Sequence, residues 1–191
     1  FFTTYKNSLG VIYIVRDPRN VITSLKHHYS FKSYDDALEF MLDKDRFSGK
    51  MGKKNTYTRE TEFPTYISNW SNHYNAWKNF KKNYLLIKYE DLIKNPKDNF
   101  NEIAKYLGNL LKIKIDAKDL NDAISMSSFK NLEQSEKKFG FIEAPPDVTT
   151  NQKKKFFNLG PDNMWEKNLP ENIRKKIENT FREEMKELNY L

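Results

Sequence analysis

The chain has 191 residues, a formal net charge of +7 and no cysteine. This length suits one domain with a core of its own, while the lack of cysteine excludes disulfide frameworks and thiolate metal sites. No apolar run approaches the roughly 20 residues of a membrane-spanning helix, and no signal-peptide pattern appears. We therefore expect a cytoplasmic protein with no membrane partner in this chain, although an anchor before Phe1 stays open.

Two short apolar runs are typical of buried strands, Val11 to Val15 and Leu85 to Tyr89. Asp17 and Pro18 follow the first run and are typical of the cap and first position of a helix. Apolar residues at helical spacing predict further helices over residues 35–42, 64–80, 95–108, 116–126 and 170–188. Residues 47–61 and 139–156 are polar, contain glycine or proline, and are predicted to be loops.

This order of elements predicts an α/β fold with parallel strands joined by long crossovers and flanked by helices. Two strands are too few for a free-standing sheet. We therefore expect the missing strands to lie before Phe1.

Arg16 lies where the first strand ends and a helix begins, the place where open α/β sheets collect anionic ligands. Asn20, Ser24 and then His27 or His28 form one polar stripe along that helix. An arginine with a nearby serine hydroxyl suits a phosphate. The alternative is a local ion pair between Arg16 and Asp17, with Ser24 as a surface residue.

Four segments resemble the soluble sulfotransferases that use 3′-phosphoadenosine 5′-phosphosulfate. They are "YIVRDPRNVITSLKHHYSF", "LLIKYEDLIKNP", "SSFKNLEQSEKKFGF" and "FFNLGPDNMWEKNLP", and they occur in the order of that family. The resemblance implies the P-loop-NTPase-like parallel sheet of the sulfotransferase fold. It further implies that residues 1–191 are one sulfotransferase domain whose N-terminal part is missing.

By the same resemblance, eight residues would bind the nucleotide. Arg16 and Ser24 would hold its 3′-phosphate, and Tyr89 would lie against the adenine. Ser127 and Phe129 would form the base pocket. The C-terminal loop would contribute Asn158, Leu159 and Gly160.

The C-terminal loop departs from the family pattern. Asn158 and Leu159 stand where the family has an arginine and a lysine that contact the 3′-phosphate, so we expect weaker cofactor binding. Lys153, Lys154 and Lys155 are candidates to replace the missing charge. Gly160 and Trp165 keep the spacing of the loop.

The catalytic histidine and the 5′-phosphosulfate loop of the family both precede the strand that starts at Val11, so no catalytic residue is identified in this chain. The segment Ser48 to Lys54 looks like a phosphate loop, but no strand precedes it and no Ser or Thr follows its lysine. His27 and His28 belong to the 3′-phosphate helix and are not assigned as the base.

The sequence thus predicts a sulfotransferase that moves a sulfuryl group from 3′-phosphoadenosine 5′-phosphosulfate to a hydroxyl or amine and releases 3′-phosphoadenosine 5′-phosphate. We expect a small-molecule, glycan or lipid acceptor, no metal and no nucleic acid, while oligomeric state stays open. The first alternative is a non-catalytic or degenerate nucleotide-binding relative. The second is a basic nucleic-acid-binding module, which rests on charge and aromatic residues alone.

Overall fold

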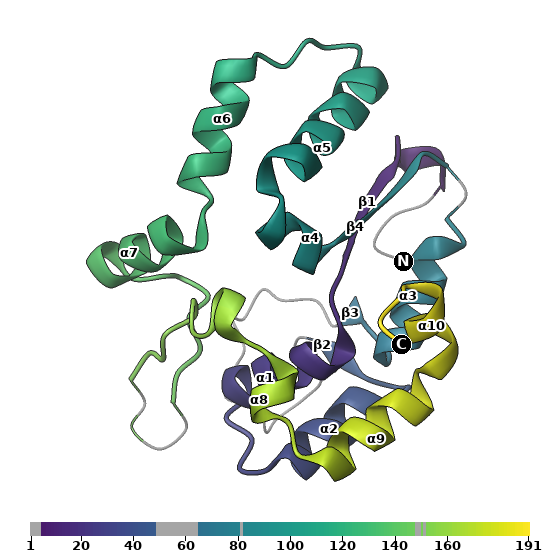
Figure 1. Cartoon of the computed structure of the whole chain (residues 1–191), viewed down its shortest axis with the longest axis vertical. Coiled ribbons are helices and arrows are strands. Elements are labelled where there is room, and N and C mark those ends of the chain that lie inside the picture. The colour runs from purple at the N-terminus through teal and green to yellow at the C-terminus, as the bar shows by residue number, and fades with distance from the viewer. Residues whose placement is uncertain (1–4, 49–64, 81, 148–149, 151) are drawn as a thin grey trace.

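A pair of parallel strands forms the centre of the computed structural model, which describes residues 5–48, 65–80, 82–147, 150 and 152–191 (Figure 1). Strand β1 (Val11–Val15) pairs with β4 (Tyr84–Lys88), and Val15 lies opposite Lys88. The predicted parallel pairing is confirmed. The prediction that Tyr89 ends the second strand is wrong, because Tyr89 is the first residue of helix α4 (Tyr89–Lys94).

The crossover between these strands begins with α1 (Pro18–His28) and α2 (Tyr34–Leu42). As predicted, Asp17 caps α1, and its carboxylate accepts the N–H of Arg19. Two short antiparallel strands, β2 (Phe47–Ser48) and β3 (Thr65–Tyr66), come next and lead into α3 (Trp70–Lys78). A 3₁₀ turn, η1 (Tyr5–Asn7), precedes β1.

The helix predicted over residues 64–80 is shorter than expected. Asn69 caps α3 by accepting the N–H of Asn72, and Ser68 before it has a positive φ of 62°, which breaks a helix. Residues 49–64, which include most of the predicted loop and the rejected phosphate-loop candidate, lie outside the described part of the chain.

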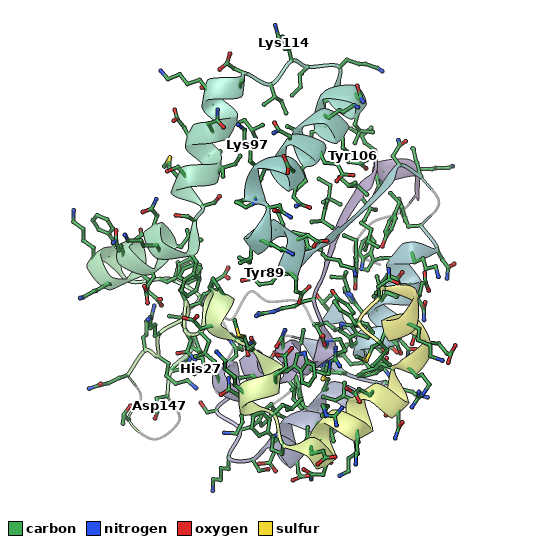
Figure 2. All side chains as sticks on the ribbon, viewed as in Figure 1. His27, Tyr89, Lys97, Tyr106, Lys114 and Asp147 are labelled. Atoms are coloured by element: carbon green, nitrogen blue, oxygen red, sulfur yellow. The ribbon has the colours of Figure 1, made fainter. Side chains whose placement is uncertain are left out.

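Three helices, α5 (Pro96–Leu111), α6 (Ala117–Met126) and α7 (Phe129–Phe139), curve away from the strands, and we call them the arch (Figure 1). The prediction that Gly108 ends α5 is wrong. The helix continues to Leu111 and ends at Lys112, whose φ of 58° and N–H bond to the Gly108 carbonyl form a left-handed cap. Tyr106, labelled in Figure 2, donates its hydroxyl to backbone oxygens of Val11 and Asn83 and fastens α5 to the strands.

The C-terminal part contains the 3₁₀ turn η2 (Gly160–Asp162), α8 (Trp165–Asn168), α9 (Glu171–Thr180) and α10 (Arg182–Glu187). The single helix predicted over residues 170–188 is wrong, because the chain bends at Phe181. That bend puts the Phe181 ring, which is fully buried, into the core.

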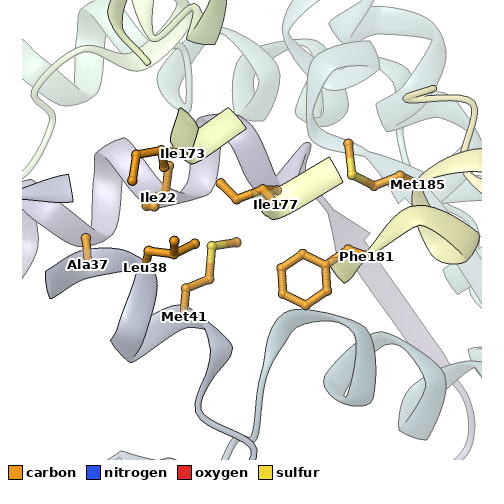
Figure 3. Packing of buried hydrophobic residues seen from close by; sticks show 8 residues of the cluster. All are labelled: Ile22, Ala37, Leu38, Met41, Ile173, Ile177, Phe181 and Met185. Carbon is orange, nitrogen blue, oxygen red and sulfur yellow. The ribbon is translucent and has the colours of Figure 1, made fainter. Parts of the chain in front are cut away.

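The main core lies where α1, α2, α9 and α10 meet (Figure 3). It consists of aliphatic, methionine and phenylalanine side chains that are almost completely buried, namely Ile22, Ala37, Leu38, Met41, Ile173, Ile177, Phe181 and Met185. This cluster holds α1 firmly against the C-terminal helices. Among the described helices, none has the length and apolar character to cross a membrane.

Candidate functional site

A cavity of about 860 Å³ opens at the carboxyl ends of β1 and β4. It lies between α1 on one side and α4, α6 and α7 on the other, and the loop of residues 156–163 closes part of it. Tyr89 and His27, labelled in Figure 2, come from these two sides. The eight residues predicted to bind the nucleotide all line this cavity: Arg16, Ser24, Tyr89, Ser127, Phe129, Asn158, Leu159 and Gly160.

Arg16 enters the cavity directly after β1. Its guanidinium carbon lies 4.3 Å from the centre of the Tyr89 ring, and its Nη2 donates a long hydrogen bond of 3.4 Å to the carbonyl of Gly160. Its Nε is buried and has no hydrogen-bond partner. A buried donor without a partner costs roughly 1–3 kcal/mol, so this arginine retains capacity for an acceptor such as a phosphate oxygen.

Asp17 does not pair with Arg16, which removes the alternative of a local ion pair. Its carboxylate instead binds Arg19, with 2.7 Å between Asp17 Oδ2 and Arg19 Nη2. Arg19 also forms a 2.8 Å ion pair with Glu178 and lies 4.0 Å from the centre of the Trp165 ring. Arg19 therefore ties α1 to α8 and α9, while Arg16 forms no ion pair with a carboxylate among the described residues.

The polar stripe of α1 holds the C-terminal loop. Asn20 Oδ1 accepts the N–H of Trp165 at 2.8 Å. The side-chain amide of Asn163 donates to the Asn20 carbonyl at 2.9 Å and to Ser24 Oγ at 3.2 Å. Because Ser24 Oγ accepts from Asn163, its own hydrogen is available for an anion in the cavity. His27 extends the stripe through a 2.8 Å hydrogen bond between its Nε2 and the Lys155 carbonyl.

The opposite side of the cavity presents aromatic faces and serine oxygens. Ser127 donates its hydroxyl to the Ala123 carbonyl at 2.8 Å, which leaves its oxygen as an acceptor. Gly160 has a φ of +51° and lies directly against Phe129, so that a Cβ at this position would come within 2.3 Å of the ring. Only glycine fits this contact between the loop and the arch.

Several residues of the site were not predicted from the sequence. Phe156 and Phe157 line the cavity, and the Phe157 ring centre lies 6.3 Å from that of Phe129. Asn163 is buried, and its Oδ1 has no hydrogen-bond partner. The two adjacent phenylalanines at the start of the loop could have indicated an aromatic wall in the sequence, whereas nothing local to Asn163 indicates its contact with Ser24.

The hypothesis that Lys153, Lys154 or Lys155 replaces the missing loop charge is not supported. Lys154 Nζ donates to the carbonyl of His27 and to Ser30 Oγ, and Lys155 Nζ pairs with Glu133. Lys153 Nζ donates to the Phe141 carbonyl at 3.2 Å. All three line a second cavity beside α7, of about 620 Å³, and none lines the first.

The charge of the first cavity therefore depends on Arg16. His28 also lines it, but burial, with the positive charge of Lys154 as a second cause, lowers the pKa of His28 below its usual value of 6.5. His28 is consequently neutral near neutral pH. Among the described residues that line this cavity, Arg16 is the one arginine or lysine.

Comparisons with known proteins find relatives that span most of this chain. A family model described as "Sulfotransferase domain" matches residues 3–189. A 3-beta-hydroxysteroid sulfotransferase from Cavia porcellus is 26% identical over 148 residues, which is 76% of this chain and 46% of that protein. Sulfotransferase 2A1 from Macaca fascicularis is 23% identical over 193 residues, which is 96% of this chain and 59% of that protein.

A similar fold occurs in a crystal structure of mouse sulfotransferase SULT7A1 complexed with PAP. The TM-score is 0.62 at 21% sequence identity, and the match covers 93% of this chain and 58% of that one. This likeness confirms the predicted fold. The chain spans about half the length of the curated relatives that it matches.

Proposed function

The chain belongs to the sulfotransferase domain family, and from this membership we propose that it serves sulfuryl transfer from 3′-phosphoadenosine 5′-phosphosulfate to a hydroxyl or amine. Its own share of that task is to hold the 3′-phosphoadenosine part of the donor. When bound, the donor supplies the sulfuryl group and leaves as 3′-phosphoadenosine 5′-phosphate. We further propose that residues 1–191 belong to one sulfotransferase domain.

The observation that carries this proposal is the buried, unpartnered Nε of Arg16 in a cavity that also contains a serine hydroxyl and aromatic rings. Arg16 would donate to the 3′-phosphate, and Ser24 would donate its free hydrogen to the same group. A site with a charged donor and a neutral donor for the 3′-phosphate should bind a nucleotide without that phosphate much more weakly.

The base would bind on the arch side of the cavity. Phe129 and Tyr89 both line the cavity, and each offers an aromatic ring for a purine. Ser127 Oγ, which can only accept because its hydrogen is engaged in α6, suits the exocyclic amino group of adenine. These roles agree in chemistry with an adenine nucleotide that carries a 3′-phosphate.

We would test this by calorimetric titration of the chain with 3′-phosphoadenosine 5′-phosphate and with adenosine 5′-phosphate. We expect the first nucleotide to bind about 10- to 100-fold more tightly, since a hydrogen bond to a charged group is worth roughly 1.5–3 kcal/mol. Arg16→Ala should remove most of that difference. Arg182→Ala is the matched control, because Arg182 binds Asn179 and does not line the cavity. Equal binding of the two nucleotides to the unaltered chain would refute the proposal.

A non-catalytic nucleotide-binding role is the second candidate. It is favoured by Asn158 and Leu159, which leave Arg16 as the one permanent cation among the described lining residues. This role predicts nucleotide binding without release of 3′-phosphoadenosine 5′-phosphate when donor and a panel of hydroxyl and amine acceptors are present. Turnover with any acceptor would exclude it.

A further inference from the structure

Tyr190, next to the last residue of the chain, is linked to the two strand ends that carry Arg16 and Tyr89. Its hydroxyl donates to Glu90 Oε2 at 3.0 Å, and its backbone carbonyl accepts from Arg19 Nη2 at 2.7 Å. Burial raises the pKa of Tyr190 well above its usual value, and the charge of Glu90 acts in the same direction. The hydroxyl therefore stays protonated and acts as a donor at all ordinary pH values.

Glu90 joins the two strand ends. It follows Tyr89 in the chain, and its Oε1 accepts the backbone N–H of Asp17 at 3.1 Å. Because Val15 and Lys88 are paired in the sheet, Arg16 and Tyr89 are the next pair of residues, beyond the last ladder position. The bond from Asp17 to Glu90 thus takes over where the strand pairing ends, and it keeps Arg16 and Tyr89 together.

The peptide unit between Arg16 and Asp17 is held at both of its polar groups. Its carbonyl, which belongs to Arg16, accepts a 3.2 Å hydrogen bond from Trp70 Nε1. Its N–H, which belongs to Asp17, donates to Glu90. With both groups engaged, the plane of this peptide is fixed, and so is the direction in which the Arg16 side chain leaves the backbone. Glu90 therefore helps to hold the backbone from which the Arg16 side chain starts.

We propose that Tyr190 is a positioning residue for the nucleotide site: by binding the second oxygen of Glu90, it fixes the carboxylate that aligns Arg16 with the 3′-phosphate of the ligand. This proposal rests on the proposed function. Tyr190 itself does not line the cavity: its hydroxyl binds Glu90 and its backbone carbonyl binds Arg19.

The test compares Tyr190→Phe with Tyr74→Phe. Tyr74 is the matched control, because its hydroxyl also donates to a glutamate, Glu187 Oε1 at 2.9 Å, and it does not line the cavity. For each variant we would measure the free energy of unfolding and the ratio of the affinities for 3′-phosphoadenosine 5′-phosphate and adenosine 5′-phosphate. If the Tyr190 hydroxyl only stabilises the fold, both variants should lose stability and the affinity ratio should stay unchanged.

We expect Tyr190→Phe to reduce the affinity ratio by about three- to tenfold, the equivalent of one hydrogen bond, while Tyr74→Phe leaves the ratio unchanged. Glu90→Gln should retain most of the ratio, because its amide oxygen still accepts from Asp17 and its NH₂ group can donate to Tyr190. If the unaltered chain binds neither nucleotide, the proposed function fails. If it discriminates between them and Tyr190→Phe discriminates equally well, the positioning role is wrong.

Should Tyr190→Phe not fold, Glu90→Gln and Glu90→Ala decide the matter. If Tyr190 and Glu90 position Arg16, Glu90→Ala should lower the ratio of the affinities for 3′-phosphoadenosine 5′-phosphate and adenosine 5′-phosphate, and Glu90→Gln should keep it. Both variants should bind adenosine 5′-phosphate with similar affinity. An unchanged ratio in Glu90→Ala would overturn it.

Discussion

The two walls of the cavity come from parts of the molecule that bury their side chains to very different degrees. Helices α1, α2, α9 and α10 share a core whose members, such as Ile22 and Phe181, are fully buried. Among the described residues of α5, α6 and α7, by contrast, none is buried. The wall that we propose for the phosphate is therefore supported by a well-packed core, whereas the wall that we propose for the adenine is carried by the arch, whose described residues are not buried.

This difference fits the roles that we propose for the two walls. A phosphate must meet its donors at fixed positions, which favours rigid support for Arg16 and Ser24. An aromatic stacking surface tolerates small displacements, so Phe129 can be carried by a less buried helix. The contact between Gly160 and Phe129 joins the two parts.

The largest expected effect comes from replacing a phenylalanine with alanine in the buried core and in the arch, which tests the difference in burial directly. Phe181→Ala should lower the free energy of unfolding by about 3–5 kcal/mol, because it leaves a cavity in the buried core. Phe139→Ala at the end of α7, where the side chain is 76% exposed, should change it by about 0.5 kcal/mol or less. Urea unfolding of both variants measures this, and similar losses would contradict the contrast.

The next effect concerns the contact between the two regions. Gly160→Ala should destabilise the protein by about 1–2 kcal/mol through its positive φ and should also weaken nucleotide binding, because the new methyl group displaces Phe129. Gly140→Ala is the matched control: its φ of +73° brings the same kind of strain, but no heavy atom lies within 4 Å of the added carbon.

Thermal unfolding and nucleotide titration of both glycine variants separate strain from displacement. We expect both to lose stability and only Gly160→Ala to lose affinity. Loss of affinity in Gly140→Ala would show that binding follows general stability and not the contact between Gly160 and Phe129.

The smallest effect is a pH dependence of stability. Burial lowers the pKa of His28, where Lys154 adds to the effect, and of His73, where Arg46 does so. The unfolded chain then binds more protons than the folded chain just below the usual pKa of 6.5, so the free energy of unfolding should fall as pH decreases. Replacing His28 and His73 with glutamine should flatten this slope in urea unfolding between about pH 7.5 and 5.5. A slope that is unchanged in the double variant would exclude these histidines as its source.

Local sequence was sufficient for features that depend on neighbouring residues. The β-branched run from Val11 to Val15, the cap at Asp17 and the apolar spacing of α6 each appear as predicted, because strand and cap preferences act over a few residues. The motif residues Arg16, Ser24 and Phe129 also line one cavity as expected. Their part in nucleotide binding stays a prediction.

Tertiary structure decided what depends on distant partners. Lys154 donates to the His27 carbonyl of α1 and Lys155 pairs with Glu133 of α7, so neither lines the cavity. The C-terminal helix is divided at Phe181, whose ring is buried in the core. Tyr190 reaches Glu90 across 100 positions of sequence. No local pattern contains such a contact, because it exists only once the chain has brought its C-terminal end to the strand ends. The sequence by itself therefore determined which residues were candidates for the site, and packing decided which charged side chains reach the cavity and which distant residues bind to the strand ends.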